Sequence, residues 1–80
     1  MAIRLVFLGR LEDAAGAGER EVAVAPTLAA VLAGLEPELA SVLSGDRIRL
    51  ARNGELVAPD AAMRLADGDE LAFLPPVSGG

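Results

Sequence analysis

Residues 47–57 read RIRLARNGELV, and this stretch predicts a β-hairpin with its turn at Asn53-Gly54. Apolar and basic side chains alternate along its first half, which places Ile48 and Leu50 together on one face of a strand. Asn and Gly both accept the positive φ angles of a tight two-residue turn, so the chain is expected to reverse there and return as a short second strand.

The segment before this hairpin has the spacing of a helix rather than a strand. Thr27 is a suitable N-cap, and Pro37 is expected to end the helix or to start another turn. A second short helix is expected over Glu38–Leu43, closed by Gly45. The apolar residues that recur at i, i+3, i+4 and i+7 are Leu28, Val31, Leu32 and Leu35.

Three further segments alternate as strands: Ala2–Leu8, Glu19–Val24 and Leu71–Leu74. A glycine-containing link joins the first two, which predicts a second hairpin, and a helix then crosses to the later strands. This order predicts one α+β domain over residues 1–80, a mixed sheet with one main helix on one face. It favours a β-grasp, ubiquitin-like arrangement in which the first and last strands lie side by side in the middle.

Composition excludes several classes of function. The chain lacks cysteine, histidine and lysine, so it has no thiolate, no neutral-pH acid–base group and no side-chain amine. The formal net charge of −5 argues against binding to nucleic acid. No signal peptide or membrane-spanning stretch is evident, and a cytoplasmic location is the default expectation. The acidic turn at Asp67, Asp69 and Glu70 is expected to be solvated, and we predict no metal site.

The C-terminal segment Pro75-Pro76-Val77-Ser78-Gly79-Gly80 is predicted to be a flexible extended tail. The prolines stiffen its base, and the glycines carry no Cβ, so a partner can close on the backbone. Six extended residues reach roughly 20 Å. The tail can therefore deliver its terminal carboxylate to the active site of another protein.

Taken together, the β-grasp order, the Asn53-Gly54-Glu55 hairpin, the Asp67-Gly68-Asp69-Glu70 turn and the ending Phe73–Gly80 resemble the small subunits of molybdopterin synthase, across the whole chain. The resemblance implies a sulfur carrier that is not catalytic alone. An adenylating partner would use ATP to activate Gly80, and sulfur would then give a C-terminal thiocarboxylate, with Gly79 as the slim residue behind it. The large subunit would take up this tail and pass the sulfur to a cyclic pterin phosphate. This chain itself would bind no cofactor.

A docking surface is expected on the sheet face opposite the helix. Val6, Leu8, Ala72 and Leu74 would form an apolar patch there, because their neighbours in sequence point toward the helix. The predicted partner-binding residues are Arg4, Val6, Leu8, Arg49, Ala72, Leu74, Pro75, Pro76, Val77 and Ser78, with Arg47 also at the edge of the patch.

Three alternative functions share these features. The chain could be a ubiquitin-like modifier joined to lysines of other proteins. It could also carry sulfur for the thiolation of thiamine precursors, cysteine precursors or tRNA. Finally, it could be a β-grasp interaction module with an inert tail.

Overall fold

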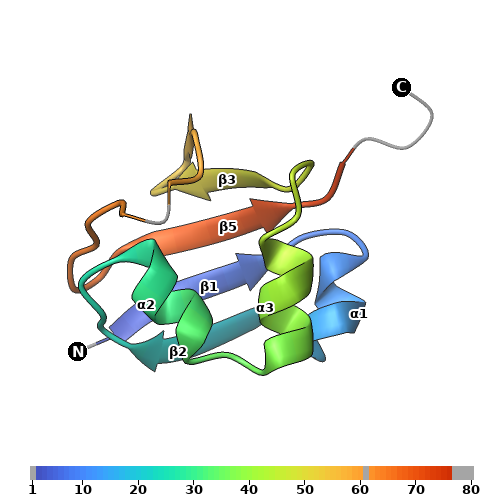
Figure 1. Cartoon of the computed structure of the whole chain (residues 1–80), viewed down its shortest axis with the longest axis horizontal. Helices are drawn as coiled ribbons and strands as arrows, with labels where there is room; N and C mark the ends of the chain where they lie inside the picture. The colour runs from blue at the N-terminus through green and yellow to red at the C-terminus, as the bar shows by residue number, and fades with distance from the viewer. Residues whose placement is uncertain (1, 61, 77–80) are drawn as a thin grey trace.

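The structure is a computed structural model that describes residues 2–60 and 62–76 (Figure 1). Its elements in chain order are β1 (Ala2–Phe7), α1 (Leu11–Ala15), β2 (Glu19–Ala23), α2 (Leu28–Ala33), α3 (Pro37–Leu43), β3 (Arg49–Arg52), β4 (Glu55–Val57) and β5 (Glu70–Leu74).

The strands form one mixed sheet in the order β2-β1-β5-β3-β4. β1 is antiparallel to β2 and parallel to β5, and β5 is antiparallel to β3. The hairpin between β3 and β4 turns at Asn53 and Gly54, whose φ angles are 51° and 86°. The predicted β-grasp fold is confirmed, with the first and last strands adjacent at the centre of the sheet.

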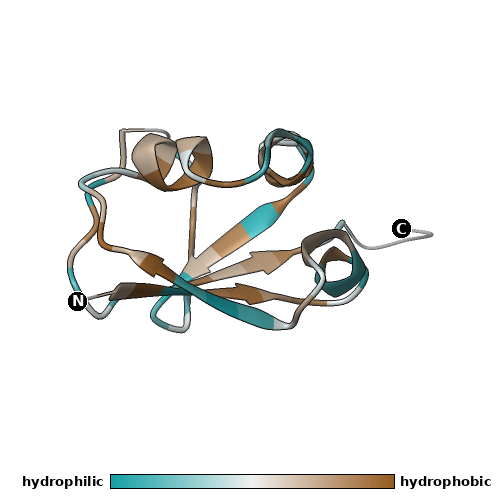
Figure 2. Ribbon diagram, turned by 90° about the horizontal axis from the view of Figure 1, so that it is seen from below, coloured by the Kyte–Doolittle hydropathy of each residue, from teal (hydrophilic) through white to brown (hydrophobic). Residues whose placement is uncertain are grey.

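Helices α2 and α3 lie on one side of the sheet and α1 lies at its end, and among the described residues no helix covers the other side (Figure 1 and Figure 2). The Thr27 hydroxyl accepts a hydrogen bond from the Ala30 amide at 3.2 Å, as expected for an N-cap. The main helix is divided into α2 and α3, because the first ends at Gly34 and Pro37 opens the second at its first turn.

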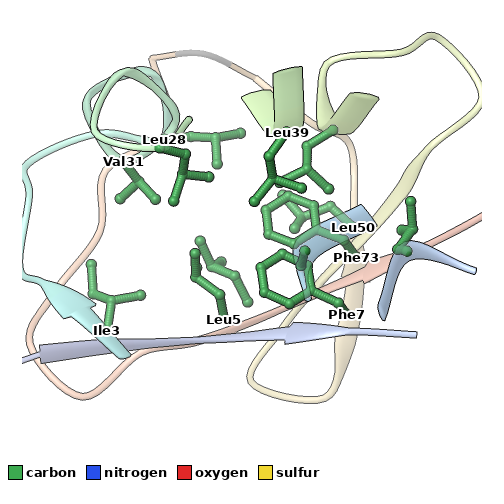
Figure 3. Close-up of a cluster of buried hydrophobic side chains, with 13 residues drawn as sticks. Ile3, Leu5, Phe7, Leu28, Val31, Leu39, Leu50 and Phe73 are labelled. Atoms are coloured by element: carbon green, nitrogen blue, oxygen red, sulfur yellow. The ribbon is translucent and has the colours of Figure 1, made fainter. Parts of the chain in front are cut away.

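The hydrophobic core fills the space between the sheet and these helices (Figure 3). Ile3, Leu5 and Leu71 are fully buried, and the rings of Phe7 and Phe73 stack with their centroids 5.9 Å apart. This pair joins the two central strands at the end of the sheet where the tail begins. The core thereby fixes the position from which the tail leaves.

Strand ends differ slightly from the predicted limits. β3 begins at Arg49 rather than Arg47, because the preceding residues form a turn. The Ile48 amide closes this turn by donating a hydrogen bond to the Gly45 carbonyl. Ile48 still packs against the core, half-buried. Across the described residues, no helix has the length and apolar character needed to cross a bilayer.

Candidate functional site

The base of the tail lies against the turn that follows β1. The Leu8 amide donates to the Phe73 carbonyl at 3.1 Å, which extends the pairing of β1 with β5 toward the tail. Gly9 comes next with φ +55°, and a Cβ at this position would stand 3.0 Å from Cγ of Pro75. Only glycine combines this backbone conformation with this clearance. Val77, Ser78, Gly79 and Gly80 lie outside the described residues.

The sheet face away from the helices carries a row of apolar side chains. Val6 pairs with Ala72, Ala72 with Ala51, and Ala51 with Leu56, so the row crosses four adjacent strands. Leu56 is 62% exposed, and the other three are half-buried although no helix in the described part of the chain covers them. We call these residues, together with Leu8 and Leu74, the outer face.

Most of the predicted partner-binding residues come together here. Leu74 pairs with Arg49, and Leu8 lies one step beyond the paired rings of Phe7 and Phe73. Leu74 is the last residue of β5 and Pro75 follows it, so these residues sit at the end of the sheet where the tail begins. The outer face is therefore next to the base of the tail.

Arg4 lies apart from this group. It pairs with Glu70 near the opposite end of the central strands, and its guanidinium lies 3.5 Å from that carboxylate and 3.8 Å from Glu19. Its charge is thus partly balanced within the chain. Arg4 borders the outer face but does not lie at the tail.

Ala51 and Leu56 belong to the outer face although the sequence analysis did not select them. The signal was present, because the Asn53-Gly54 turn fixes which residues of the two strands face each other. Following that register from Ala51 leads directly to Leu56.

The acidic turn before β5 has a structural role. The Asp69 carboxylate accepts hydrogen bonds from the Ala66 amide at 2.9 Å and the Asn53 side-chain amide at 3.1 Å, and Arg52 lies 3.1 Å away. The hydrogen bond from Ala66, then that from Asn53, lowers the pKa of Asp69 below its usual value.

Asp69 is 8% exposed, so the expectation of a solvated cluster is wrong for this residue: its oxygens are occupied by protein donors. Within residues 2–60 and 62–76, no group of His, Cys, Asp or Glu is placed to hold a metal ion.

A family model matches most of the chain. The match is to the ThiS family over residues 5–80. Two curated relatives are each described as a molybdopterin synthase sulfur carrier subunit. That of Escherichia coli is 35% identical, with 98% of this chain and 99% of the relative covered. That of Chlamydomonas reinhardtii is 33% identical, with both chains covered completely.

Solved structures show the same architecture. SAMP1, the small archaeal modifier protein 1 of Haloferax volcanii, superposes with a TM-score of 0.78 at 31% identity, and the match covers both chains completely. A chain from the complex of subunits 1 and 2 of the molybdopterin-converting factor of Helicobacter pylori gives a TM-score of 0.68 at 26% identity, again over both full chains.

Proposed function

The chain belongs to the ThiS family, and from this membership we propose that it is the sulfur-carrier subunit of a molybdopterin synthase. The observation that carries the proposal is the similarity, over essentially the whole chain, to two relatives named as that subunit. The Helicobacter pylori structure, a complex of subunits 1 and 2 of the molybdopterin-converting factor, supports association with a second subunit.

The proposed reactive group is the carboxylate of Gly80. An α-carboxylate is ionised at neutral pH and is a poor electrophile, so it must first be activated. An adenylating partner would join it to the α-phosphate of ATP and release pyrophosphate. Hydrosulfide supplied by another protein would then attack the carbonyl carbon, and the bond to AMP would break to leave a thiocarboxylate, free AMP and a proton.

The side chains of this protein fit the role of carrier rather than catalyst. The sequence has no cysteine to hold sulfur as a persulfide and no histidine to act as a base. The chain's contribution would be to present Gly80 behind Gly79, whose lack of a side chain suits a narrow channel. Sulfur transfer to a cyclic pterin phosphate would take place on the large subunit.

The outer face is proposed as the surface that binds the large subunit. An exposed apolar row with charged residues at its edge is typical of a protein–protein interface. It lies beside the base of the tail, so a subunit bound there is in position to receive residues 77–80. Val6, Leu8, Ala72 and Leu74 would supply apolar contacts, and Arg4 and Arg49 would lie at the rim.

Intact mass spectrometry of the protein isolated from its native cells tests the sulfur-carrier role. We expect a fraction in which one oxygen is replaced by sulfur, and co-purification of a pterin-binding large subunit. A variant that lacks Gly80 should fold normally but fail to support cofactor synthesis. Full synthesis by that variant would refute the proposal.

A protein modifier is the second candidate, favoured by the similarity to small archaeal modifier protein 1. The same activated Gly80 would then form an amide with a lysine of a target protein. A ladder of larger conjugates in the native cells, absent when Gly80 is removed, would support this function. The two products differ in mass, so one measurement separates them.

A further inference from the structure

Two open hollows flank the base of the tail, and Pro76 lines both. Their volumes are about 420 and 690 Å³. The segment Asp46–Ile48 lines both hollows as well. Any protein that takes up the tail must bring its own surface against these hollows.

The charged side chains in the hollows are mostly basic, although the protein as a whole is acidic. Arg10 lines one hollow, Arg49 the other and Arg47 both, whereas Asp46 is the single acidic residue among those that line them. The chain carries twelve acidic residues against seven arginines. Positive charge is therefore concentrated at the tail. We call Arg10, Arg47 and Arg49 the basic collar.

The collar is also free to interact with a partner. All three of its arginines are exposed, and none forms an ion pair or a side-chain hydrogen bond with another residue in the described part of the chain. Three other arginines form ion pairs within the chain. Arg4 pairs with Glu19 and Glu70, Arg20 pairs with Glu36, and Arg52 pairs with Asp69. The remaining unpaired arginine in the described residues is Arg64, outside both hollows.

The arrangement fits a protein surface better than a phosphate ligand. A phosphate is bound by donors that converge on one point, but Arg10 and Arg49 line different hollows. Separated guanidinium groups around the base of the tail match carboxylates spread around an opening.

We infer that the basic collar is the recognition surface for the adenylating enzyme, through carboxylates around the opening that receives the tail. This inference rests on the proposed function. Exposed charge pairs chiefly raise the rate of encounter and allow rapid release, which suits an enzyme that must let its product go. An apolar row such as the outer face suits the longer-lived contact with a subunit.

The test is the kinetics of ATP–pyrophosphate exchange with the adenylating enzyme from the same organism, at low ionic strength. R10Q/R47Q should raise KM for the carrier by about tenfold with little change in kcat, because a charge that acts in the encounter does not enter the chemistry. The single variant R47Q should show a smaller rise in KM. R47K should return KM most of the way to the value of the unaltered chain. R64Q is the matched control, an unpaired arginine outside the collar, and should match the unaltered chain.

Each remaining outcome decides the matter. Equal KM values for R10Q/R47Q and the unaltered chain would overturn the inference while leaving the adenylation itself intact. Weakened binding of R10Q/R47Q to the large subunit with unchanged KM would assign the collar to that partner and also overturn it. If inorganic pyrophosphate alone perturbed the NMR signals of the collar guanidinium groups, the collar would be a phosphate site and the inference would be overturned. No exchange with the unaltered chain would refute the adenylation step and the inference together.

Discussion

At the scale of single residues, Gly9 connects the backbone of the first turn to the position of the tail. Its φ of +55° is strained for any residue with a Cβ, and that Cβ would come within 3.0 Å of the Pro75 ring. Pro75 is itself rigid, so neither partner can easily move away. Gly16 has a similar φ of +78° but has no atom near its would-be Cβ.

Replacing Gly9 with alanine therefore tests whether the tail base must be held in place. Both Gly9→Ala and Gly16→Ala should lower the free energy of unfolding by about 1–2 kcal/mol through backbone strain, as measured by denaturant titration. Gly9→Ala should lose more unfolding free energy than Gly16→Ala, because Pro75 must shift. Of the two variants, only Gly9→Ala should reduce sulfur transfer. Equal losses of stability, with normal transfer in both variants, would show that the contact with Pro75 has no consequence.

At the scale of elements, two turns far apart in sequence are fastened together. The side chain of Asn53, in the turn between β3 and β4, forms two of these connections. Its amide nitrogen donates a hydrogen bond to the Asp69 carboxylate, and its oxygen accepts one from the Glu70 backbone amide at 2.9 Å. Arg52 adds an ion pair to the same carboxylate. These bonds join the β3–β4 hairpin to the start of β5, the strand that ends at the tail.

Asp69→Asn should weaken this junction. We expect a loss of about 1–3 kcal/mol at neutral pH, since the replacement leaves Arg52 and the Ala66 amide without their charged acceptor. Asp67→Asn is the control, because Asp67 is exposed and, among the described residues, accepts a hydrogen bond only from the Ala2 amide. Denaturant unfolding measures both, and equal small losses would contradict a special role for Asp69.

The junction also predicts how stability depends on pH. The pKa of Asp69 is lowered in the folded chain, mainly by the hydrogen bond from Ala66, so the carboxylate favours the folded state when it is ionised. That contribution is complete above the unfolded pKa of about 4 and is lost as the pH falls through the lower folded value. Asp69→Asn should flatten the decline of unfolding free energy below pH 4, and an unchanged acid profile would show that another group controls it.

Local patterns in the sequence were sufficient to predict the helices and strands but not the side-chain contacts between them. The alternation around Leu50 predicted its burial, and Thr27 predicted the start of α2, because both depend on near neighbours. The contact between Arg52 and Asp69 joins residues 17 positions apart, so no local period indicates it. The same reason applies to one residue of the basic collar: the sequence indicated Arg47 and Arg49 at the edge of the docking patch, but Arg10 comes close to the tail only through the fold.

At the scale of the whole molecule, the two sides of the sheet differ in what they can do. One side is filled by helices and the core, whereas the other presents the outer face without a helical cover among the described residues (Figure 2). The collar lies where this face meets the tail, since Arg49 pairs with Leu74. The surface proposed for a lasting partner and the surface proposed for a transient one are thus both adjacent to the base of the tail.

A charge placed on the outer face should separate binding from folding. Leu74→Glu should weaken the affinity for the large subunit by about 10- to 100-fold, because a carboxylate would have to be desolvated in an apolar contact. Leu56→Glu should act in the same direction without touching the tail base, since Leu56 lies on the edge strand β4. Val24→Glu is the control, as an exposed apolar residue beyond the end of β2. Calorimetric titration gives the three affinities, and full binding by both leucine variants would remove the outer face from the interface.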